Sequence, residues 1–297
     1  MLFGTLEAGG TKMVLSVGNG QNELLEQETI PTEMPEKTIP AMIDWFRDKG
    51  ISALGIGTFG PVDLNPASPT YGWITKTPKP GWRDMPLLPP MRDALGVPVR
   101  IDTDVNAAAL AEWQLGAAKG LQSCLYVTVG TGIGAGLVAE GRLVHGLLHP
   151  ELGHMLLRQE PGDPAPDGFC PYHRGCLEGL ASGPAIAKRW GTKAQDLSPD
   201  PEAWKLEAAY LAQMCMNAIC AFSPEKIILG GGVMQQEHLF PLIRRRTREL
   251  LNGYIPADAI LEHMDSYITA PGLGTRSGAT GALLLARAAW DEAAENA

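Results

Sequence analysis

Three glycine-rich turns are the first features of this sequence with chemical potential. Each follows a stretch that is expected to form a strand. Glycine lets backbone N–H groups approach an anion closely because it has no Cβ atom. Ordinary turn glycines are the alternative for any single turn, but three together favour phosphate binding. The turns are Gly9-Gly10-Thr11-Lys12, Gly130-Thr131-Gly132-Ile133-Gly134 and Gly230-Gly231-Gly232-Val233, and none has the Gly-x4-Gly-Lys-Ser/Thr pattern of a Walker loop.

Two aspartates stand where a strand is expected to end and a helix to begin, in Asp102-Thr103-Asp104-Val105-Asn106. Ligands of open α/β sheets bind at the carboxyl ends of strands. Phosphoryl transfer to a hydroxyl needs a carboxylate that accepts the proton and aims the oxygen. Asp104 or Asp102 could do this. The alternative is that one aspartate or Asn106 merely caps the helix.

A cluster of sulfur and nitrogen ligands is formed by Cys170, His173 and Cys176, with His154 upstream. These four side chains suit a tetrahedral Zn²⁺ ion, which would be structural because the ligands fill all four positions. Residues 161–168 are too rich in proline to fold alone, so a metal clip would explain how they become ordered. A Cys170–Cys176 disulfide, which a reducing compartment disfavours, and a chance cluster are the alternatives.

Carboxylates in the same region indicate a sugar site. Glu151 and Glu178 lie close to the cluster in sequence, and planar polar side chains of this kind can pair with neighbouring hydroxyls. If one ring nitrogen of His154 holds zinc, the other is available to donate to a ligand. A lone glutamate in a loop is usually solvated, so this interpretation depends on the cluster around it.

The elements that must position these residues alternate between strands and helices, which indicates an α/β fold. A strand, a glycine turn with threonine and a second strand occur twice, about 120 residues apart, and suggest two lobes on one plan. Residues 60–90 are expected to form a long ordered loop. The expected strands are 2–7, 13–17, 52–58, 97–103, 123–129, 136–139, 226–229 and 267–270, and the expected helices include 107–118, 202–221 and 277–294.

Composition narrows the class of protein. A chain of 297 residues favours two domains of about 150 residues each. Its net charge of −9 disfavours a nucleic-acid partner, and the basic run at 244–248 is expected to be a solvated helix face. No stretch reaches the roughly 20 apolar residues of a membrane span, and the N-terminus lacks the charged region of a signal peptide. Cys124, Cys215 and Cys220 are expected to be buried free thiols, which indicates the cytoplasm.

Taken together, the motifs resemble those of the ROK family (repressors, uncharacterised reading frames and sugar kinases), and specifically its bacterial fructokinase branch. The resemblance covers the whole chain. Besides the segments already quoted, it rests on Glu7-Ala8, Gly60-Pro61-Val62-Asp63, Ala107-Ala108-Ala109, Thr128-Val129, His149-Pro150-Glu151-Leu152-Gly153-His154, Cys170 through Ala181, and Ile228-Leu229.

The resemblance implies a two-lobed actin-like ATPase (ribonuclease H-like) fold with a zinc-clipped loop. Residues 1–118 plus about 277–297 would form the N-terminal lobe, and 119–276 the C-terminal lobe with most of the nucleotide site. It also implies Mg²⁺ and ATP as cofactors, a small-molecule sugar substrate, a homodimer, and no nucleic-acid or membrane partner.

By the same resemblance, each motif acquires a role. Asp104 takes the place of the catalytic base, and structural Zn²⁺ would sit on His154, Cys170, His173 and Cys176. The nucleotide would be bound by Gly9, Gly10, Thr11, Lys12, Thr131, Gly132, Gly134, Gly179, Gly230, Gly231 and Gly232. The sugar would be bound by Gly60, Pro61, Thr103, Asp104, Glu151, His154 and Glu178.

Two departures from the wider family refine the expected substrate. Many of its sugar kinases carry a sugar-binding asparagine where this chain has Thr103, which puts glucose in doubt, and the Cys-x2-His-x2-Cys spacing is that of fructokinase-like members. The first phosphate motif begins at residue 7, which leaves no room for the DNA-binding domain of the family's repressors. The resemblance therefore implies phosphorylation of D-fructose to D-fructose 6-phosphate.

Two alternatives remain. Mannose, glucose or an N-acetylhexosamine could be the substrate of the same chemistry, because sequence discriminates poorly between hydroxyl orientations. A sugar sensor that binds without phosphorylating is the alternative of another class. Asp104, Lys12 and the three glycine turns argue against a sensor, which needs no phosphate-binding apparatus.

Overall fold

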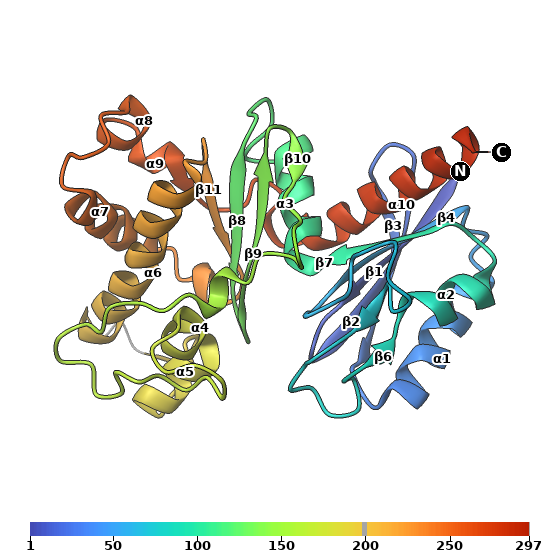
Figure 1. Ribbon diagram of the computed structural model, residues 1–297, viewed down its shortest axis with the longest axis horizontal. Helices are drawn as coiled ribbons and strands as arrows, with labels where there is room; N and C mark the ends of the chain where they lie inside the picture. The colour runs from blue at the N-terminus through green and yellow to red at the C-terminus, as the bar shows by residue number, and fades with distance from the viewer. Residues whose placement is uncertain (198–200, 297) are drawn as a thin grey trace. The chain divides into compact units, whose positions relative to one another are not determined.

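The computed structural model describes residues 1–197 and 201–296, and the chain forms two compact units (Figure 1). Unit 1 consists of Met1–Gln114, Leu143–Pro150 and Arg276–Ala297. Unit 2 consists of Leu115–Arg142 and Glu151–Thr275. Residues 143–150 were expected in the second lobe but group with unit 1. The reason is that two of their side chains bond to unit 1, as described below.

Unit 1 is built on a mixed five-stranded sheet in the order β3-β2-β1-β4-β7. The first three strands pair antiparallel, whereas β4 pairs parallel with both β1 and β7. The central strands are buried on both faces, and this is why they are apolar almost throughout. The strands are β1 (Leu2–Ala8), β2 (Lys12–Asn19), β3 (Leu24–Pro31), β4 (Ala53–Thr58) and β7 (Val99–Thr103).

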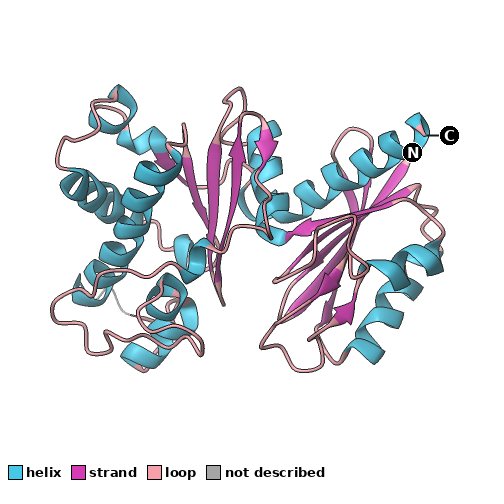
Figure 2. Ribbon diagram, in the orientation of Figure 1, coloured by secondary structure: helices cyan, strands magenta, loops and turns pink. Residues whose placement is uncertain are grey.

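Helices pack against this sheet (Figure 2). One hydrophobic cluster joins the sheet to α1 (Pro35–Arg47) and α2 (Leu88–Leu95) through side chains such as Met42 and Met91. A separate cluster joins it to α10 (Ser277–Glu295) through Leu283 and Ala286. Residues 60–90 are less loop-like than expected, since they include the hairpin strands β5 (Trp73–Ile74) and β6 (Met85–Pro86) and the start of α2.

Close backbone packing holds the helix that follows β7, α3 (Asp104–Gln114), against α10. A Cβ atom at Gly281 of α10 would lie 1.8 Å from the carbonyl oxygen of Ala107. A Cβ atom at Gly55 of β4 would likewise lie 1.9 Å from the oxygen of Ala282. Glycine at these two positions therefore lets α10 approach the backbones of α3 and β4 closely, and a side chain at Gly281 or Gly55 would push α10 away from α3 or from β4.

Unit 2 repeats the same plan. Its five-stranded sheet has the order β10-β9-β8-β11-β12, in which β8 and β9 are antiparallel and β11 is parallel to both β8 and β12. Two sheets of matching order and strand direction define the actin-like, ribonuclease H-like fold that was expected. The strands are β8 (Cys124–Val129), β9 (Ile133–Ala139), β10 (Arg142–Leu143), β11 (Ile227–Gly230) and β12 (Ile268–Thr269).

Unit 2 also contains the irregular region that carries the Cys/His cluster and a long helix, α6 (Pro201–Phe222). Its other helices are α4 (Leu177–Ala181), α5 (Gly183–Trp190), α7 (Leu239–Leu251), α8 (Asp258–Leu261) and α9 (Met264–Tyr267). Short 3₁₀ turns occur at η1 (Leu152–His154), η2 (Val233–Gln235) and, where the chain returns to unit 1, η3 (Gly274–Arg276). Within residues 1–197 and 201–296, none of the helices combines the length and apolarity of a membrane span.

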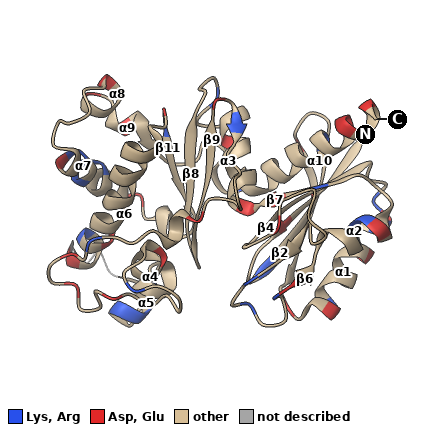
Figure 3. Cartoon of the chain, in the orientation of Figure 1, with Lys and Arg blue, Asp and Glu red and all other residues tan. Residues whose placement is uncertain are grey.

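Two expectations about the surface need correction. Cys124 and Cys215 are buried free thiols as expected, but Cys220, near the end of α6, is exposed. In the basic run of α7, acidic and basic residues are interspersed (Figure 3), as a solvated face requires, but Arg244 is half-buried. Its guanidinium donates to the carbonyl oxygens of Ile268 and Asp265, so it ties α7 to β12.

Candidate functional site

The junction between β7 and α3 carries the two aspartates of the candidate catalytic motif. Thr103, the last residue of β7, is the residue that caps α3: its hydroxyl oxygen accepts a hydrogen bond from the backbone N–H of Asn106 (3.1 Å). Sequence reasoning considered an aspartate or Asn106 as the alternative capping residue and overlooked the threonine. Thr103 is buried, and its capping bond occupies the hydroxyl oxygen on the helix side.

Asp102 is engaged on both carboxylate oxygens within the protein. Its Oδ1 accepts from the backbone N–H of Thr103 (2.8 Å) and from the Asn106 side-chain amide (2.7 Å). Its Oδ2 lies 2.9 Å from Nε2 of His145. Asp102 is only 5% exposed, so it is a buried and fully bonded anion. Asp104, the first residue of α3, is half-buried, and its Oδ1 accepts from the N–H of Val105 (2.9 Å).

The first glycine turn of unit 1 joins β1 to β2 and presents three consecutive exposed residues: Gly10, Thr11 and Lys12. The turn is closed by a hydrogen bond from Gly9 N–H to the Lys12 carbonyl (3.0 Å). A Cβ atom at Gly9 would lie 2.7 Å from that carbonyl oxygen, whereas one at Gly10 would meet nothing within 4 Å. Gly9 is therefore required by the turn itself, and Gly10 leaves open space beside the backbone.

Glu7, in the strand before this turn, is an acidic group that sequence reasoning quoted but gave no role. Burial raises the pKa of its carboxyl, and the charge of Lys12 acts in the opposite direction. A Cβ atom at Gly278 of α10 would lie 2.8 Å from the carboxyl carbon. The Glu7 carboxyl thus packs against Gly278 of α10, next to the first glycine turn, and Lys12 is the charged residue that acts on it.

The other two glycine turns lie side by side in unit 2, because β8 and β11 are parallel neighbours and each turn follows the carboxyl end of its strand. A Cβ atom built at Gly130 would be 4.0 Å from the backbone nitrogen of Gly232. Gly231 has φ +91°, and a Cβ atom there would lie 2.5 Å from the carbonyl oxygen of Val129. The structure thus brings these two turns together at one sheet edge, where ligands of such folds bind.

Two carboxyl groups of unit 2, those of Glu151 and Glu178, lie close enough for the charge of one to affect the other. Oε2 of Glu178, at the start of α4, accepts from the backbone N–H of Ile133 (2.9 Å), within the second glycine turn. Desolvation of Glu151, whose side chain is still exposed to solvent, and secondarily the charge of Glu178 raise the pKa of the Glu151 carboxyl to about 7. Two carboxyl groups in this arrangement can pair with neighbouring sugar hydroxyls.

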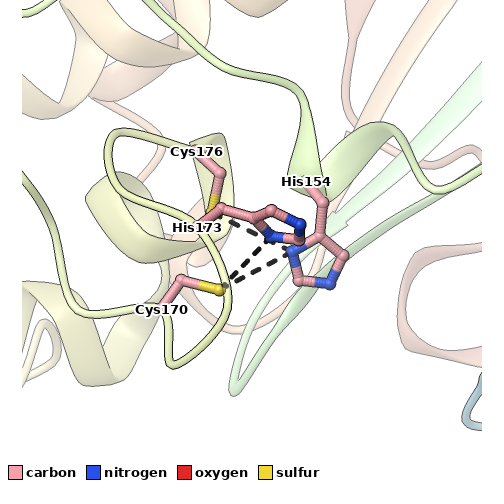
Figure 4. A group of neighbouring side chains, drawn as sticks. All are labelled: His154, Cys170, His173 and Cys176. Atoms are coloured by element: carbon pink, nitrogen blue, oxygen red, sulfur yellow. Dashed lines mark hydrogen bonds between the residues drawn. The ribbon is translucent and has the colours of Figure 1, made fainter. Parts of the chain in front are cut away.

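The predicted metal ligands converge (Figure 4). The candidate ligand atoms of His154, Cys170, His173 and Cys176 all lie within 4.8 Å of one another. Sγ of Cys170 is 3.7 Å from Nδ1 of His173 and 3.9 Å from Nδ1 of His154, and Sγ of Cys176 is 3.9 Å from the same His154 atom. In a zinc tetrahedron, bonds of about 2.3 Å to sulfur and 2.0 Å to nitrogen place these atoms roughly 3.5 Å apart.

The donor set and its geometry therefore fit a Zn²⁺ ion. His154 directs Nδ1 into the cluster, so its Nε2 points away from it (Figure 4). Burial raises the pKa of the Cys176 thiol to about 11, and the thiolate that a metal needs would be stabilised there by the positive charge of the ion.

A buried network that sequence reasoning missed holds the proline-rich loop 161–168. Asp163 accepts two hydrogen bonds from the Arg189 guanidinium (2.9 and 3.2 Å) and one from the Tyr210 hydroxyl (2.6 Å). The Asp163 and Arg189 side chains are 0% and 1% exposed. The loop thus has an ion-pair anchor besides the four-ligand cluster, whereas sequence reasoning ascribed its order to metal alone.

The remaining predicted residues are placed as follows. Gly60 packs on a histidine ring, since a Cβ atom there would lie 3.1 Å from Cε1 of His149, and Pro61 is half-buried beside it. Gly179 is buried, and a Cβ atom there would be 2.8 Å from the backbone nitrogen of Cys170. This position requires glycine because it packs closely against the backbone of Cys170. The nucleotide contact expected of Gly179 stays a prediction.

Two further histidines contribute to the site: His145 on Asp102 and His149, whose Nε2 accepts from the backbone N–H of Val62 (3.3 Å). The density of histidines after residue 144 was the available signal. Nothing in the local spacing linked these two histidines to β7 and to the loop after β4, because the contacts join positions at least 43 residues apart.

Two units of actin-like topology, each with a glycine turn at the carboxyl edge of its sheet, define a phosphotransferase-type ATPase fold. The chain belongs to the ROK family, which it matches over residues 3–289. It is 45% identical to a fructokinase of Pediococcus pentosaceus over 289 residues, covering 97% of this chain and 99% of the relative. It is 42% identical to a fructokinase of Zymomonas mobilis subsp. mobilis, covering 97% of both chains.

The fold is likewise found among solved structures. The crystal structure of a ROK family glucokinase from Streptomyces griseus, in complex with glucose and AMPPNP, superimposes with a TM-score of 0.77 at 25% identity. The superposition covers 97% of this chain and 100% of the glucokinase.

Proposed function

We propose that this protein is an ATP-dependent hexose kinase that converts D-fructose to D-fructose 6-phosphate. The observation that carries the proposal is the similarity over 97% of the chain to two fructokinases, at 45% and 42% identity. It is supported by the geometry of the candidate site, in which an aspartate opens a helix at a sheet edge and glycine turns end β1, β8 and β11.

In this proposal Asp104 accepts the proton of the attacking sugar hydroxyl, while Asp102 stays engaged by its three donors. Phosphoryl transfer depends on positioning and on stabilisation of charge rather than on covalent chemistry by the protein. The backbone N–H groups of Gly10, Thr11 and the turn at 131–134 would bind the phosphates, and Lys12 would offset their charge. Mg²⁺ would supply further neutralisation between phosphate oxygens.

For the nucleoside and the sugar, the proposal uses the remaining predicted residues. Gly230, Gly231 and Gly232 would border the nucleoside, since they lie beside the second glycine turn. Glu151, Glu178 and Nε2 of His154 would contact sugar hydroxyls. Thr103 supports fructose over glucose because its short hydroxyl offers one donor where an asparagine amide offers two, and one of its lone pairs already accepts the capping bond.

We also propose that the Cys/His cluster holds structural Zn²⁺. Its two thiols and two imidazoles complete a tetrahedral set, which leaves no position for a catalytic water. The ion would fix the chain between His154 and Cys176, where Leu156 and Cys176 form an isolated β-bridge. It would thereby hold His154 and Glu178 in place for the substrate.

Two further proposals concern the state of the protein in the cell. The five cysteines are free, and free thiols are typical of a reducing compartment, which supports the cytoplasm. A homodimer is expected from the resemblance to the family, and analytical ultracentrifugation of purified protein tests it: a single species of monomer mass would contradict it.

The test of the proposed function is ADP release with Mg-ATP, measured on zinc-replete protein against fructose, mannose, glucose and N-acetylglucosamine. A kcat/KM for fructose well above the others is the expected result. A different preferred sugar would keep the kinase chemistry and overturn the fructose assignment. Absence of turnover with every sugar, together with sugar binding by calorimetry, would favour a non-catalytic sensor.

A further inference from the structure

Residues 143–150 form a short segment, here called the histidine segment, that is docked on unit 1 by two side chains. His145 places Nε2 2.9 Å from Oδ2 of Asp102, and His149 accepts at Nε2 from the backbone N–H of Val62. Between them the chain makes a tight turn, in which Gly146 N–H donates to the Leu148 carbonyl (2.8 Å). The first anchor is thus attached to the strand that ends at the proposed base.

The two histidines need opposite protonation states. His145 faces two acceptors, the Asp102 carboxylate and the backbone carbonyl of Leu143, and this pair of partners favours the form in which both ring nitrogens donate. The hydrogen bond to Asp102 is the largest influence, and it raises the pKa of His145. His149 must instead stay neutral, because its Nε2 is an acceptor, and burial lowers its pKa.

Other charged groups near His145 and Asp102 do not replace the contact between these two side chains. Besides Asp102, the charged group that acts on His145 is Arg100 of β7, and the neighbouring His149 is neutral in its accepting role. Arg100 is occupied by Glu292 of α10, with its Nη1 3.5 Å from the carboxylate. Nδ2 of Asn106 lies 3.4 Å from Nε2 of His145 because both nitrogens donate to the same Asp102 carboxylate. His145 is therefore the side chain that bonds the second carboxylate oxygen of the buried Asp102.

What Asp102 holds is the junction at the start of α3. Its Oδ1 bonds the N–H of Thr103, the capping residue, and the side chain of Asn106 in the first turn of the helix. Asp104 lies between these two bonded positions in the chain. A buried carboxylate that loses its partner is strongly unfavourable, and relief by reorientation of Asp102 would release both bonds. A change at His145 would therefore reach the backbone that presents Asp104.

We propose that His145 is a positioning residue for phosphoryl transfer: acting through Asp102, it fixes the β7–α3 junction that aims the Asp104 carboxylate. The proposal rests on the role of Asp104 in the proposed function. His145 has no proton to exchange with the substrate in this role, since both of its N–H groups are committed to Asp102 and to Leu143.

A double-mutant cycle on the full-length enzyme tests the proposal. His145→Ala is expected to lower kcat by roughly tenfold, because a hydrogen bond to a charged group is lost, with little change in either KM. His145→Gln keeps an N–H donor near the Nε2 position and is expected to recover part of the rate. In an Asp102→Asn background, His145→Ala should cost almost nothing more, since its partner charge is already absent.

His263→Gln is the matched control, since His263 is an exposed histidine of unit 2, and it should leave kcat unchanged. Unchanged kcat in folded His145→Ala, or losses that multiply in the double variant, would overturn the proposal. If instead Asp104→Asn keeps full activity, the proposed base itself is wrong, so the two failures are distinguishable.

An NMR titration of the histidine rings gives a readout that does not depend on catalysis or on the stability of His145→Ala. In the wild type, His145 should titrate above the range of an ordinary histidine, and in Asp102→Asn its pKa should fall. An equal pKa in the two proteins would show that Asp102 does not hold His145 in solution and would overturn the proposal.

Discussion

At the scale of single residues, the structure separates two aspartates that are two positions apart. Asp102 is buried and bonded by three donors, which suits an anchor, whereas Asp104 is half-buried at the start of a helix. A general base must reach a substrate hydroxyl, and it must be able to take up a proton. Asp102 meets neither requirement, so the choice that remained open in the sequence favours Asp104.

Asp104→Asn should lower kcat by about 10²–10⁴-fold, the range expected when general-base catalysis alone is lost, and leave both KM values close to those of the wild type. Steady-state ADP release with fructose measures it. Asp93→Asn, at an exposed position of α2, serves as the control for introducing the same change elsewhere in unit 1. A folded Asp104→Asn enzyme with near-normal rate would exclude Asp104 as the base.

Residue-level prediction from sequence succeeded where spacing is short and failed where contacts are long. The Cys-x2-His-x2-Cys spacing was enough to predict a cluster, and its ligand atoms do converge. The cap at Thr103 was missed because aspartate and asparagine also cap helices, so the choice depends on side-chain direction rather than residue type. The pairing of His145 with Asp102 joins residues 43 positions apart, and no local pattern encodes it.

At the scale of elements, the proline-rich loop of unit 2 is fixed by the Asp163–Arg189 pair. Asp163→Asn removes the charge but keeps the shape, and it leaves a buried guanidinium without its anion. Breaking a buried pair by removing one partner costs about 3–5 kcal/mol, so we expect a loss of unfolding free energy of that order. Chemical denaturation followed by fluorescence measures it.

Asp167→Asn, in the same loop, is the matched control because the Asp167 side chain is 62% exposed and pairs only at the surface. Its effect should stay within about 0.5 kcal/mol. Equal effects of the two substitutions would mean that the loop is not held by the buried pair.

Glu207, on α6, provides a prediction about pH. Its side chain is buried, and its Oε1 has no hydrogen-bond partner in the described part of the chain. Burial raises the pKa of Glu207 well above 4.5, and the charge of Arg189 only partly opposes this. The folded state therefore holds this proton more tightly than the unfolded state, so stability is lost as pH rises above about 4.5.

Glu207→Gln removes that dependence. Its melting temperature should match the wild type near pH 5 within a small offset and exceed it increasingly toward pH 8. Glu202→Gln, at an exposed position of the same helix, should give a difference that does not vary with pH. A constant difference between Glu207→Gln and the wild type across this range would contradict a protonated, buried Glu207.

Elements differ in how far the sequence could predict them. The buried strands β1, β4, β8 and β11 are mostly apolar, and each was predicted. Strand β3 was missed because it is an edge strand with mostly exposed side chains, and its sequence LLEQETIP has no apolar periodicity. The short strands β5 and β6 were also missed, since two residues are too few for any pattern.

At the scale of the whole molecule, one strand order occurs twice in the chain. The repeat was visible in the sequence only as two glycine hairpins, because the rest of each unit is elaborated differently. Unit 1 adds helices α1 and α2 to its sheet, whereas unit 2 inserts the metal loop after β10. A fold prediction from pattern alone could reach the α/β class, and the resemblance of the motifs was needed to reach the actin-like topology.

The division into units makes the effect of metal removal local. All four candidate ligands belong to unit 2, as does the Asp163–Arg189 anchor of the adjoining loop. Chelation should therefore open the chain between His154 and Cys176 and raise its amide exchange, while the sheet of unit 1 keeps its protection. Hydrogen exchange measured by mass spectrometry, with and without chelator, follows both units in one sample.

Two cysteine variants test whether the four-ligand cluster is the site of the metal. Cys170→Ser should lose the metal and reproduce the exchange pattern of the chelated protein, and its KM for the sugar should rise because Glu178 and His154 are no longer held. Cys220→Ser, at an exposed thiol outside the cluster, should retain one zinc per chain and full protection. Fresh wild-type protein that contains no zinc by elemental analysis would rule out the structural ion. If the fresh protein contains zinc but chelation raises amide exchange uniformly across both units, the metal stabilises the molecule as a whole.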